Sequence, residues 1–301
     1  MKRIIIPFLI LILALSGCSV RTEQAQIAAT TLPVYEFTQR LCEGTGITVT
    51  RLVTEEVSCL HDYSLNVRQV KAAESAETIV ISGAGLEEFL DDILLDADCI
   101  DASEGIHLLS PGDGHDHDHE DSHEAAHEED HEGHHHEEDP HIWLSPENAK
   151  VMVSNIFNGL SKRYPAHSAT FVENEAKLME ELTALQTYGE EMLADLNCRE
   201  LITFHDGFAY FAQAFDLEIL EAVEEESGSE ASAKELIHLI KEVEHHSLPA
   251  IFTEKSGSVS AAGVITRETG CESFALDMAM AGDSYFDAMY HNIDTIKEAL
   301  G

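Results

Sequence analysis

The stretch Thr78-Ile79-Val80-Ile81-Ser82-Gly83-Ala84-Gly85 joins a short apolar run to a glycine-rich break. Residues 78–82 are typical of a strand that is buried on both faces, as in a parallel sheet. Helical patterns over 66–75 and 86–95 flank this run. The alternation of strand and helix predicts an α/β fold with a mostly parallel sheet.

The same rhythm occurs in both halves of the chain, which predicts two lobes. In the first half the other expected strands are 27–31, 47–53, 99–100 and, more weakly, 106–109, with a helix over 33–41. Ser145 and Pro146 form a good helix start for 145–163. In the second half the strands are 200–204, 217–223, 250–254 and 273–277, with helices to 215 and over 231–245, 259–269 and 284–300.

Between the halves, apolar residues recur at helical spacing from Pro165 to Leu196. Roughly 31 residues at ~1.5 Å each give ~45 Å of helix, which is longer than one small lobe needs. We therefore expect this helix to pass from one lobe to the other, although it could lie on a single lobe. The expected division is an N-terminal lobe of 27–164, a linking helix of 165–196 and a C-terminal lobe of 197–301.

The charge of the chain excludes some partners. Its 301 residues include 57 Asp and Glu against 17 Lys and Arg, a formal net charge of −40. This charge argues against nucleic acid and against anionic lipid as ligands of the folded surface, and it favours a cation. The apolar share of 44% is ordinary for a globular protein.

The N-terminus resembles a lipoprotein signal. Met1-Lys2-Arg3 is basic, and the apolar run over 4–15 is too short to span a bilayer, which needs about 20 residues. Leu15-Ser16-Gly17-Cys18 then resembles a lipobox, so we expect a signal peptide of 1–17, lipid on Cys18 and a tether over 18–26. An ordinary cleaved signal with an unmodified Cys18 is the alternative. Either way the mature protein lies outside the membrane, and a lipid anchor fits a Gram-positive surface best.

Of the 6 cysteines, those after Cys18 are odd in number, so at least one is a free thiol or forms an intermolecular bridge. No disulfide pairing follows from the spacing, and the absence of C-x-x-C argues against a Cys zinc cluster.

Residues 113–138 form an acidic, histidine-rich stretch without Lys or Arg. Imidazole is the commonest protein ligand for zinc-like cations, and these side chains cannot build a packed core. We expect a loop that binds metal weakly at several positions and collects it beside a built site; a solvated acidic spacer is the alternative. The candidate ligands in the loop are His115, His117, His119, His123, His127, His131, His134, His135 and His136.

Four residues outside that loop are candidates for a built metal site. His205 and Asp277 end predicted strands, His61 lies in a loop after one, and His141 precedes a helix. Ligands of open α/β sheets bind outside the carboxyl ends of the strands, so two facing lobes could bring the four side chains together in an inter-lobe cleft. Three imidazoles and a carboxylate suit tetrahedral zinc. Spacing alone does not separate them from the remaining histidines, which are His107, His167, His238, His245, His246 and His291.

The chain resembles the metal-receptor family (cluster A-I) of solute-binding proteins that serve ABC uptake systems, and most of all its zinc-specific, ZnuA-like branch. The residues that carry the resemblance run through nearly the whole mature chain: His61-Asp62-Tyr63, Gly83-Ala84-Gly85-Leu86-Glu87, Asp139-Pro140-His141-Ile142-Trp143-Leu144-Ser145-Pro146, Thr203-Phe204-His205-Asp206-Gly207-Phe208-Ala209-Tyr210-Phe211, and Leu276-Asp277 ahead of Gly282-Asp283-Ser284-Tyr285.

The resemblance implies two Rossmann-like α/β lobes joined by one long rigid helix, with the metal between them. The family's four ligands map in order to His61, His141, His205 and Asp277. Manganese-type relatives usually carry Glu at the third position, so His205 favours Zn²⁺ over Mn²⁺. The sequence departs from the family at two positions, where Leu60 and Met278 stand in place of the family's prolines. The second departure, next to Asp277, leaves the fourth ligand open. Glu55, Glu56 or water could replace Asp277, and Cys59 could add a soft ligand, although a buried apolar thiol is its simpler role.

The implied function is capture of Zn²⁺ outside the membrane by a monomer and delivery to an ABC permease. The ATPase must be a separate polypeptide, because the chain has no G-x-x-x-x-G-K-[ST]. A zinc hydrolase is disfavoured, since no H-E-x-x-H occurs and Asp277 would close the position that a catalytic zinc keeps open. A manganese receptor of the same family and a surface zinc buffer or adhesin are the alternatives.

Overall fold

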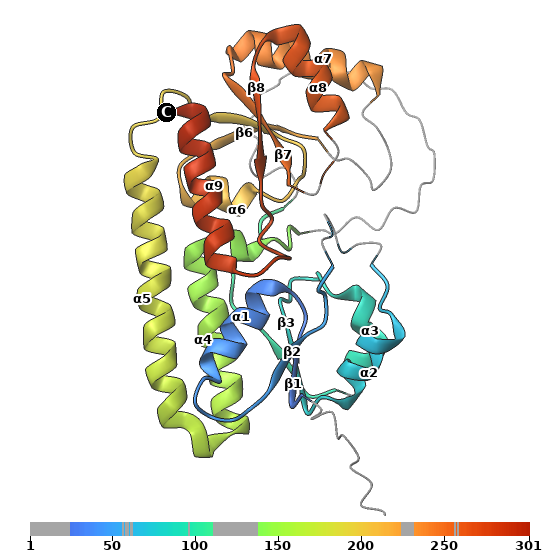
Figure 1. Cartoon of the computed structure of the whole chain (residues 1–301), viewed down its shortest axis with the longest axis vertical. Helices are drawn as coiled ribbons and strands as arrows, with labels where there is room; N and C mark the ends of the chain where they lie inside the picture. The colour runs from blue at the N-terminus through green and yellow to red at the C-terminus, as the bar shows by residue number, and fades with distance from the viewer. Residues whose placement is uncertain are drawn as a thin grey trace, which may run out of the picture.

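The computed structural model describes residues 25–55, 57, 60, 63–95, 97–110, 138–223, 232–255, 257 and 259–301. These residues form two α/β lobes with a long helix that runs beside both (Figure 1). The predicted two-lobed α/β fold is therefore confirmed. Within the described ranges, every helix is too short or too polar to cross a bilayer.

The N-terminal lobe is built on a four-stranded parallel sheet in the order β2-β1-β3-β4. Its strands are β1 (Ile27–Ala29), β2 (Val49–Arg51), β3 (Thr78–Ile81) and β4 (Cys99–Asp101). Its helices are α1 (Leu32–Leu41), α2 (Val67–Ser75) and α3 (Asp91–Leu94), with the 3₁₀ turn η1 (Glu88–Leu90).

The C-terminal lobe repeats the arrangement, with parallel strands in the order β6-β5-β7-β8. The strands are β5 (Glu200–Thr203), β6 (Glu218–Ala222), β7 (Ala250–Glu254) and β8 (Glu272–Leu276). The helices are α6 (Ala209–Ala214), α7 (Ala233–His246), α8 (Ser260–Thr269) and α9 (Tyr285–Leu300). The strand order reverses between β5 and β7, and the carboxyl ends of strands at such a point border a ligand crevice.

Four helical segments follow in the chain before the C-terminal sheet: η2 (Ile142–Leu144), α4 (Pro146–Arg163), η3 (Pro165–His167) and α5 (Ser168–Met192). The first two belong to the N-terminal lobe, and α5 joins the two lobes. The first half of α5 binds the N-terminal lobe, where the Asn174 amide donates to the Leu41 carbonyl at 3.0 Å. Its second half meets the C-terminal lobe. There Gly189 lies so close to Phe215 that a β-carbon would be 2.2 Å from the ring. The helix therefore runs from one lobe to the other, as predicted.

The long helix ends at Met192, four residues before the expected Leu196. The guanidinium of Arg199 donates to the carbonyls of Leu193 and Ala194, at 2.8 and 3.0 Å. These bonds satisfy backbone acceptors that another helical turn would have used. A helix of 25 residues is about 37 Å long at ~1.5 Å per residue.

One apolar core runs through both lobes. It joins the inner faces of the two sheets to α1, α4, α5 and α9, and its fully buried members include Phe37, Trp143, Phe171 and Tyr285. The outer face of each sheet has a smaller core of its own, under α7 and α8 in one lobe and under α2 and α3 in the other. Because the inner core is continuous, the lobes pack as one body.

One expected strand is absent, and one expected helix is much shorter than predicted. Residues 106–109 form no strand, because the Ile106 amide binds the Ser103 carbonyl and the Leu109 amide binds the Tyr210 hydroxyl. The helix expected over 86–95 shrinks to η1 and α3. Its first turn is lost because the Glu87 side chain folds back onto the strand end that precedes it.

That strand end is closed by a buried carboxylate. Glu87 is 4% exposed and accepts hydrogen bonds from the Thr30 hydroxyl at 2.6 Å and the amides of Ser82 and Gly83 at 2.7 and 3.0 Å. Gly83 has φ +84°, and a β-carbon there would meet the Asp101 carboxylate at 2.0 Å, so only glycine fits. This network holds the ends of β1 and β3 together.

The described cysteines Cys42, Cys99, Cys198 and Cys271 are all free thiols. Cys59 lies outside the described residues, so the prediction of a free thiol or an intermolecular bridge stays a prediction. Burial raises the pKa of Cys42 to about 12, which makes that thiol unreactive.

We predict that Glu87 makes the stability of the protein depend on pH. Burial raises the pKa of this carboxyl to about 7, against three hydrogen bonds that lower it. A raised folded-state pKa gives stability that is complete below the ordinary value near 4.5 and is lost as pH rises through about 7. The unfolding free energy of the wild type relative to Glu87→Gln should therefore fall between pH 5 and pH 8, measured by urea denaturation.

The exposed carboxyl of Glu298 on α9 provides the control substitution, Glu298→Gln. If the difference in unfolding free energy between the wild type and Glu87→Gln instead stays constant or grows with pH, Glu87 is charged in the folded protein throughout this range.

Candidate metal centre

His141 is fixed at the start of η2 by the acid two residues before it. The Oδ1 atom of Asp139 accepts from the His141 backbone amide at 2.9 Å and lies 2.8 Å from the ring Nδ1. His141 is only 3% exposed, and its ring meets Trp143 edge-on at 5.4 Å between centroids. The imidazole therefore has one orientation, with Nε2 directed away from Asp139.

His205 follows β5 and brings a second imidazole from the other lobe. Its Nε2 lies 3.3 Å from the Nε2 of His141, and the two rings are nearly perpendicular. Two nitrogens bound to one tetrahedral zinc at ~2.0–2.1 Å lie roughly 3.3–3.4 Å apart. The two lobes thus already hold a pair of donors at the separation that zinc requires.

Each imidazole has a carboxylate behind it. Glu254 ends β7, is 6% exposed, and places Oε1 3.4 Å from the Nδ1 of His205. Asp139 has the same relation to His141. A carboxylate on the far ring nitrogen fixes the tautomer and raises the basicity of a metal-binding histidine. Both Nε2 atoms are therefore prepared as donors to a cation.

Backbone packing holds the pair in place. The Trp143 indole donates to the Met278 carbonyl at 2.7 Å, which brings Met278 beside the rings. A β-carbon at Gly207 would lie 2.7 Å from the Cδ2 of His205 and 3.1 Å from the Cε1 of His141. A side chain at position 207 would therefore have to displace Met278 and the imidazoles.

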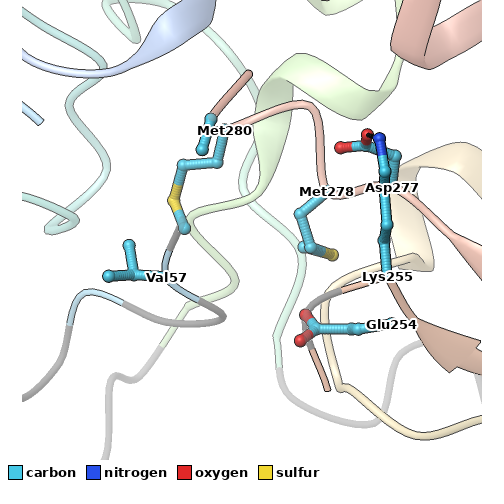
Figure 2. Close-up of a pocket in the computed structure, with 7 residues that line it drawn as sticks. Val57, Glu254, Lys255, Asp277, Met278 and Met280 are labelled. Atoms are coloured by element: carbon cyan, nitrogen blue, oxygen red, sulfur yellow. Dashed lines mark hydrogen bonds and ion pairs between the residues drawn. The ribbon is translucent and has the colours of Figure 1, made fainter. Parts of the chain in front are cut away.

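Asp277, the predicted carboxylate ligand, lies in an adjoining pocket. Its Oδ1 accepts from the Ala279 amide at 2.8 Å, and its Oδ2 lies 3.2 Å from the Lys255 ammonium. In Figure 2 the Lys255 ammonium lies beside the Asp277 carboxylate, whereas the Glu254 carboxylate lies apart from both. The pocket is lined by Val57, Glu254, Lys255, Asp277, Met278, Met280 and Ala281. Asp277 is thus near the imidazole pair, but its carboxylate forms an ion pair with the Lys255 ammonium.

The other predicted ligands divide into two groups. Glu55 is described, and its Oε2 accepts hydrogen bonds from the Tyr63 hydroxyl at 2.9 Å and from the Gln69 amide at 3.1 Å. These bonds lower the pKa of the Glu55 carboxyl, and the bond from Tyr63 has the largest effect. The remaining candidate ligands lie outside the described residues: His61, Glu56, Cys59 and the loop residues His115, His117, His119, His123, His127, His131, His134, His135 and His136. Cys18, the predicted lipidation site, also lies outside them.

The two sides of the histidine-rich loop meet beside the site. The Asp139 amide donates to the Leu109 carbonyl at 2.8 Å. The Tyr210 hydroxyl of α6 donates to the Asp139 carbonyl and accepts from the Leu109 amide, both at 2.9 Å. Leu109 and Asp139, which are described on either side of residues 111–137, therefore lie together close to His141, where Tyr210 ties both lobes together.

Two residues of the centre, Asp139 and Glu254, were not singled out as functional from the sequence. Glu254 ends a buried strand, just as His205 follows one, so the rule about strand ends applies equally to both. An acid two residues before a candidate histidine is a weaker signal, because acidic residues crowd this part of the sequence.

Comparison with known proteins gives a consistent result. The family described as "Zinc-uptake complex component A periplasmic" (ZnuA) matches residues 27–299. The zinc-binding protein AdcA of Streptococcus pyogenes serotype M3 is 29% identical over 288 residues. That match covers 91% of this chain and 56% of the relative, so the chain spans little more than half of the relative's length.

Solved structures share the fold. A crystal structure of ZnuA aligns with a TM-score of 0.75 and 26% identity, covering 92% of this chain and 100% of the other. The Zn(II)-bound ZnuA-like domain of Streptococcus pneumoniae AdcA aligns with a TM-score of 0.74 and 26% identity, covering 91% and 98%.

We predict that Gly207→Ala weakens zinc binding without unfolding the protein. The added methyl can displace the flexible end of Met278, but it must also push His205 away from His141. Displacing a correctly oriented ligand should cost about 10–100-fold in affinity, as disturbance of outer-shell partners does. Competition with a tight chromogenic chelator measures this loss in the full chain.

Gly263→Ala on α8 is the matched control, because nothing lies within 4 Å of its added methyl. Equal zinc affinity in the two variants would mean that the separation of the imidazoles does not determine binding.

Proposed function

Because the chain belongs to the family of the zinc-uptake complex component A, we propose that it captures Zn²⁺ outside the membrane and delivers it to an ABC-type import permease. The observation that carries this proposal is the 3.3 Å separation of two imidazole nitrogens, one from each lobe. The carboxylates of Asp139 and Glu254 support it, because each fixes one ring.

In this proposal His141 and His205 bind zinc through Nε2, and His61 and Asp277 complete the tetrahedron. Asp277 is favoured over Glu55 for the fourth position. Glu55 is held by Tyr63 and Gln69 within the N-terminal lobe, whereas Asp277 shares a pocket with Glu254 beside the imidazoles. To bind zinc, the Asp277 carboxylate would exchange Lys255 for the cation. Lys255 is 65% exposed, so its ammonium can move into solvent.

Four protein ligands would leave no open position on the metal, which is why we propose a receptor rather than a hydrolase. The proposed partners are a permease and a separate ATPase subunit. Lipid on Cys18 would hold the protein at the outer face of the membrane. Residues 113–138 would collect zinc at weaker sites through their imidazoles, the commonest protein ligands for zinc-like cations.

The test is zinc affinity of the full chain in competition with a tight chelator, which reports the strongest site and not the weaker loop sites. His205→Ala and His141→Ala should each lose more than about 100-fold, because each removes a direct ligand rather than an outer-shell partner. His167→Ala, a change outside the centre, should bind as the wild type does. Unchanged tight binding in His205→Ala would refute the assignment.

Delivery is tested separately from binding. A strain lacking this protein should grow poorly in zinc-starved medium and recover with the wild type but not with His205→Ala. Normal growth of the deletion strain would favour a surface buffer or adhesin instead.

A further inference from the structure

A second group of metal-binding side chains lies at the end of α7. Glu242, His245 and His246 each offer one possible ligand atom, and these three atoms lie within 4.8 Å of one another. Residues three and four apart share a face of a helix, so this spacing can chelate an ion from a single helical turn. We call these three residues the α7 cluster.

A carboxylate from a neighbouring strand fixes one ring of this cluster. Glu200, the first residue of β5, places Oε2 3.1 Å from the Nδ1 of His246. The opposite nitrogen, Nε2, lies 3.7 Å from Glu242 Oε2. This is the relation seen at His141 and His205: one ring nitrogen is held by a carboxylate, and the other is directed to where a cation would bind.

The spacing is close to that of a zinc site. Ligand atoms on tetrahedral zinc lie roughly 3.3–3.4 Å apart, so no pair of ligand atoms in the α7 cluster needs to close by more than about 1.5 Å. The side chains of His246 and Glu242 are 23% and 27% exposed, and His245 is exposed. Rotation of these side chains can supply the closure without moving the backbone.

The α7 cluster is separate from the inter-lobe centre. It lies at the start of β5, whereas His205 follows the end of that strand. The five residue steps from Glu200 to His205 span about 16 Å at ~3.3 Å each. In Figure 1 α7 covers the outer side of the C-terminal lobe, away from the N-terminal lobe. An ion here would contact neither His141 nor His205.

We propose that the α7 cluster is a second site for Zn²⁺ or a similar transition-metal cation. Glu242, His245 and His246 supply three ligands, water supplies the fourth, and Glu200 orients His246. The bound ion links the last turn of α7 to the start of β5 through the His246 ring. The opposing account is a set of solvated ion pairs at a helix end, where protonated histidines are favourable without any metal.

His238 distinguishes the two accounts, because it lies near the cluster but outside the proposed ligand set. Its Nε2 is 2.9 Å from Glu221 Oε1, and its Nδ1 is 3.8 Å from Glu242 Oε1. An ion-pair cluster would use His238 and His246 alike, whereas the metal site requires His246 and not His238.

The test is hydrogen exchange of the full chain with and without zinc chloride, followed by mass spectrometry of peptides that cover the end of α7. Zinc bound to the folded turn slows its opening by the factor 1 + [Zn²⁺]/Kd, so about tenfold slowing is expected at ten times the Kd of this site. In His238→Gln, zinc should slow hydrogen exchange at α7 as much as in the wild type. The double variant Glu242→Gln/His246→Gln should lose the slowing at α7 but keep any slowing at peptides around His141.

Exchange of each variant in chelator shows whether α7 is intact before zinc is added. If the double variant opens there without zinc, Glu242→Gln alone replaces it. Absence of any zinc-dependent slowing at α7 would overturn the proposal, as would equal slowing in the variants that lack a ligand. Loss of the slowing in His238→Gln would also overturn it, because the ion would then use a different set of residues.

Discussion

The candidate metal centre depends on the buried contact between Trp143 and the segment that follows β8. The Trp143 indole donates to the Met278 carbonyl, and the Tyr285 hydroxyl donates to the Trp143 carbonyl at 2.8 Å. Trp143 and Tyr285 are fully buried, so these bonds are made where no water can replace them. Since Trp143 belongs to one lobe and Met278 to the other, this contact sets how the lobes face each other.

Because of this packing, the centre does not need a large closure of the lobes to form. The continuous inner core and α5 hold the lobes as one body, and His141 and His205 already stand at a separation suited to zinc. The remaining adjustment concerns side chains at the rim, above all Asp277 and Lys255. Carboxylates lie behind both imidazoles in a chain of net charge −40, so the local and the long-range fields both favour a cation.

Much of this arrangement could be predicted from the sequence. The apolar runs at Thr78–Ile81 and Ala250–Glu254 became buried parallel strands, because their residues can pack on both faces of a sheet. His205 was predicted at the carboxyl end of its strand and is there. The predicted convergence of imidazoles from the two lobes is seen for His141 and His205.

What could not be predicted depends on particular side-chain bonds. The end of α5 is set by Arg199, and the loss of a helical turn after residue 85 follows from the bonds of Glu87. Helical spacing does not reveal which backbone groups these side chains bind, and Glu87 also binds the distant Thr30. The partner of Asp277 is likewise decided by where β7 places Lys255, a relation between two strands that spacing within one strand does not reveal.

The central claim, that imidazoles from both lobes bind one cation, is tested most directly by a crystal structure of the zinc-loaded full chain with diffraction data at the zinc absorption edge. The account predicts an anomalous peak ~2.0–2.1 Å from the Nε2 atoms of both His141 and His205. A tightly bound zinc held by residues of only one lobe, with these two imidazoles uncoordinated, would contradict it.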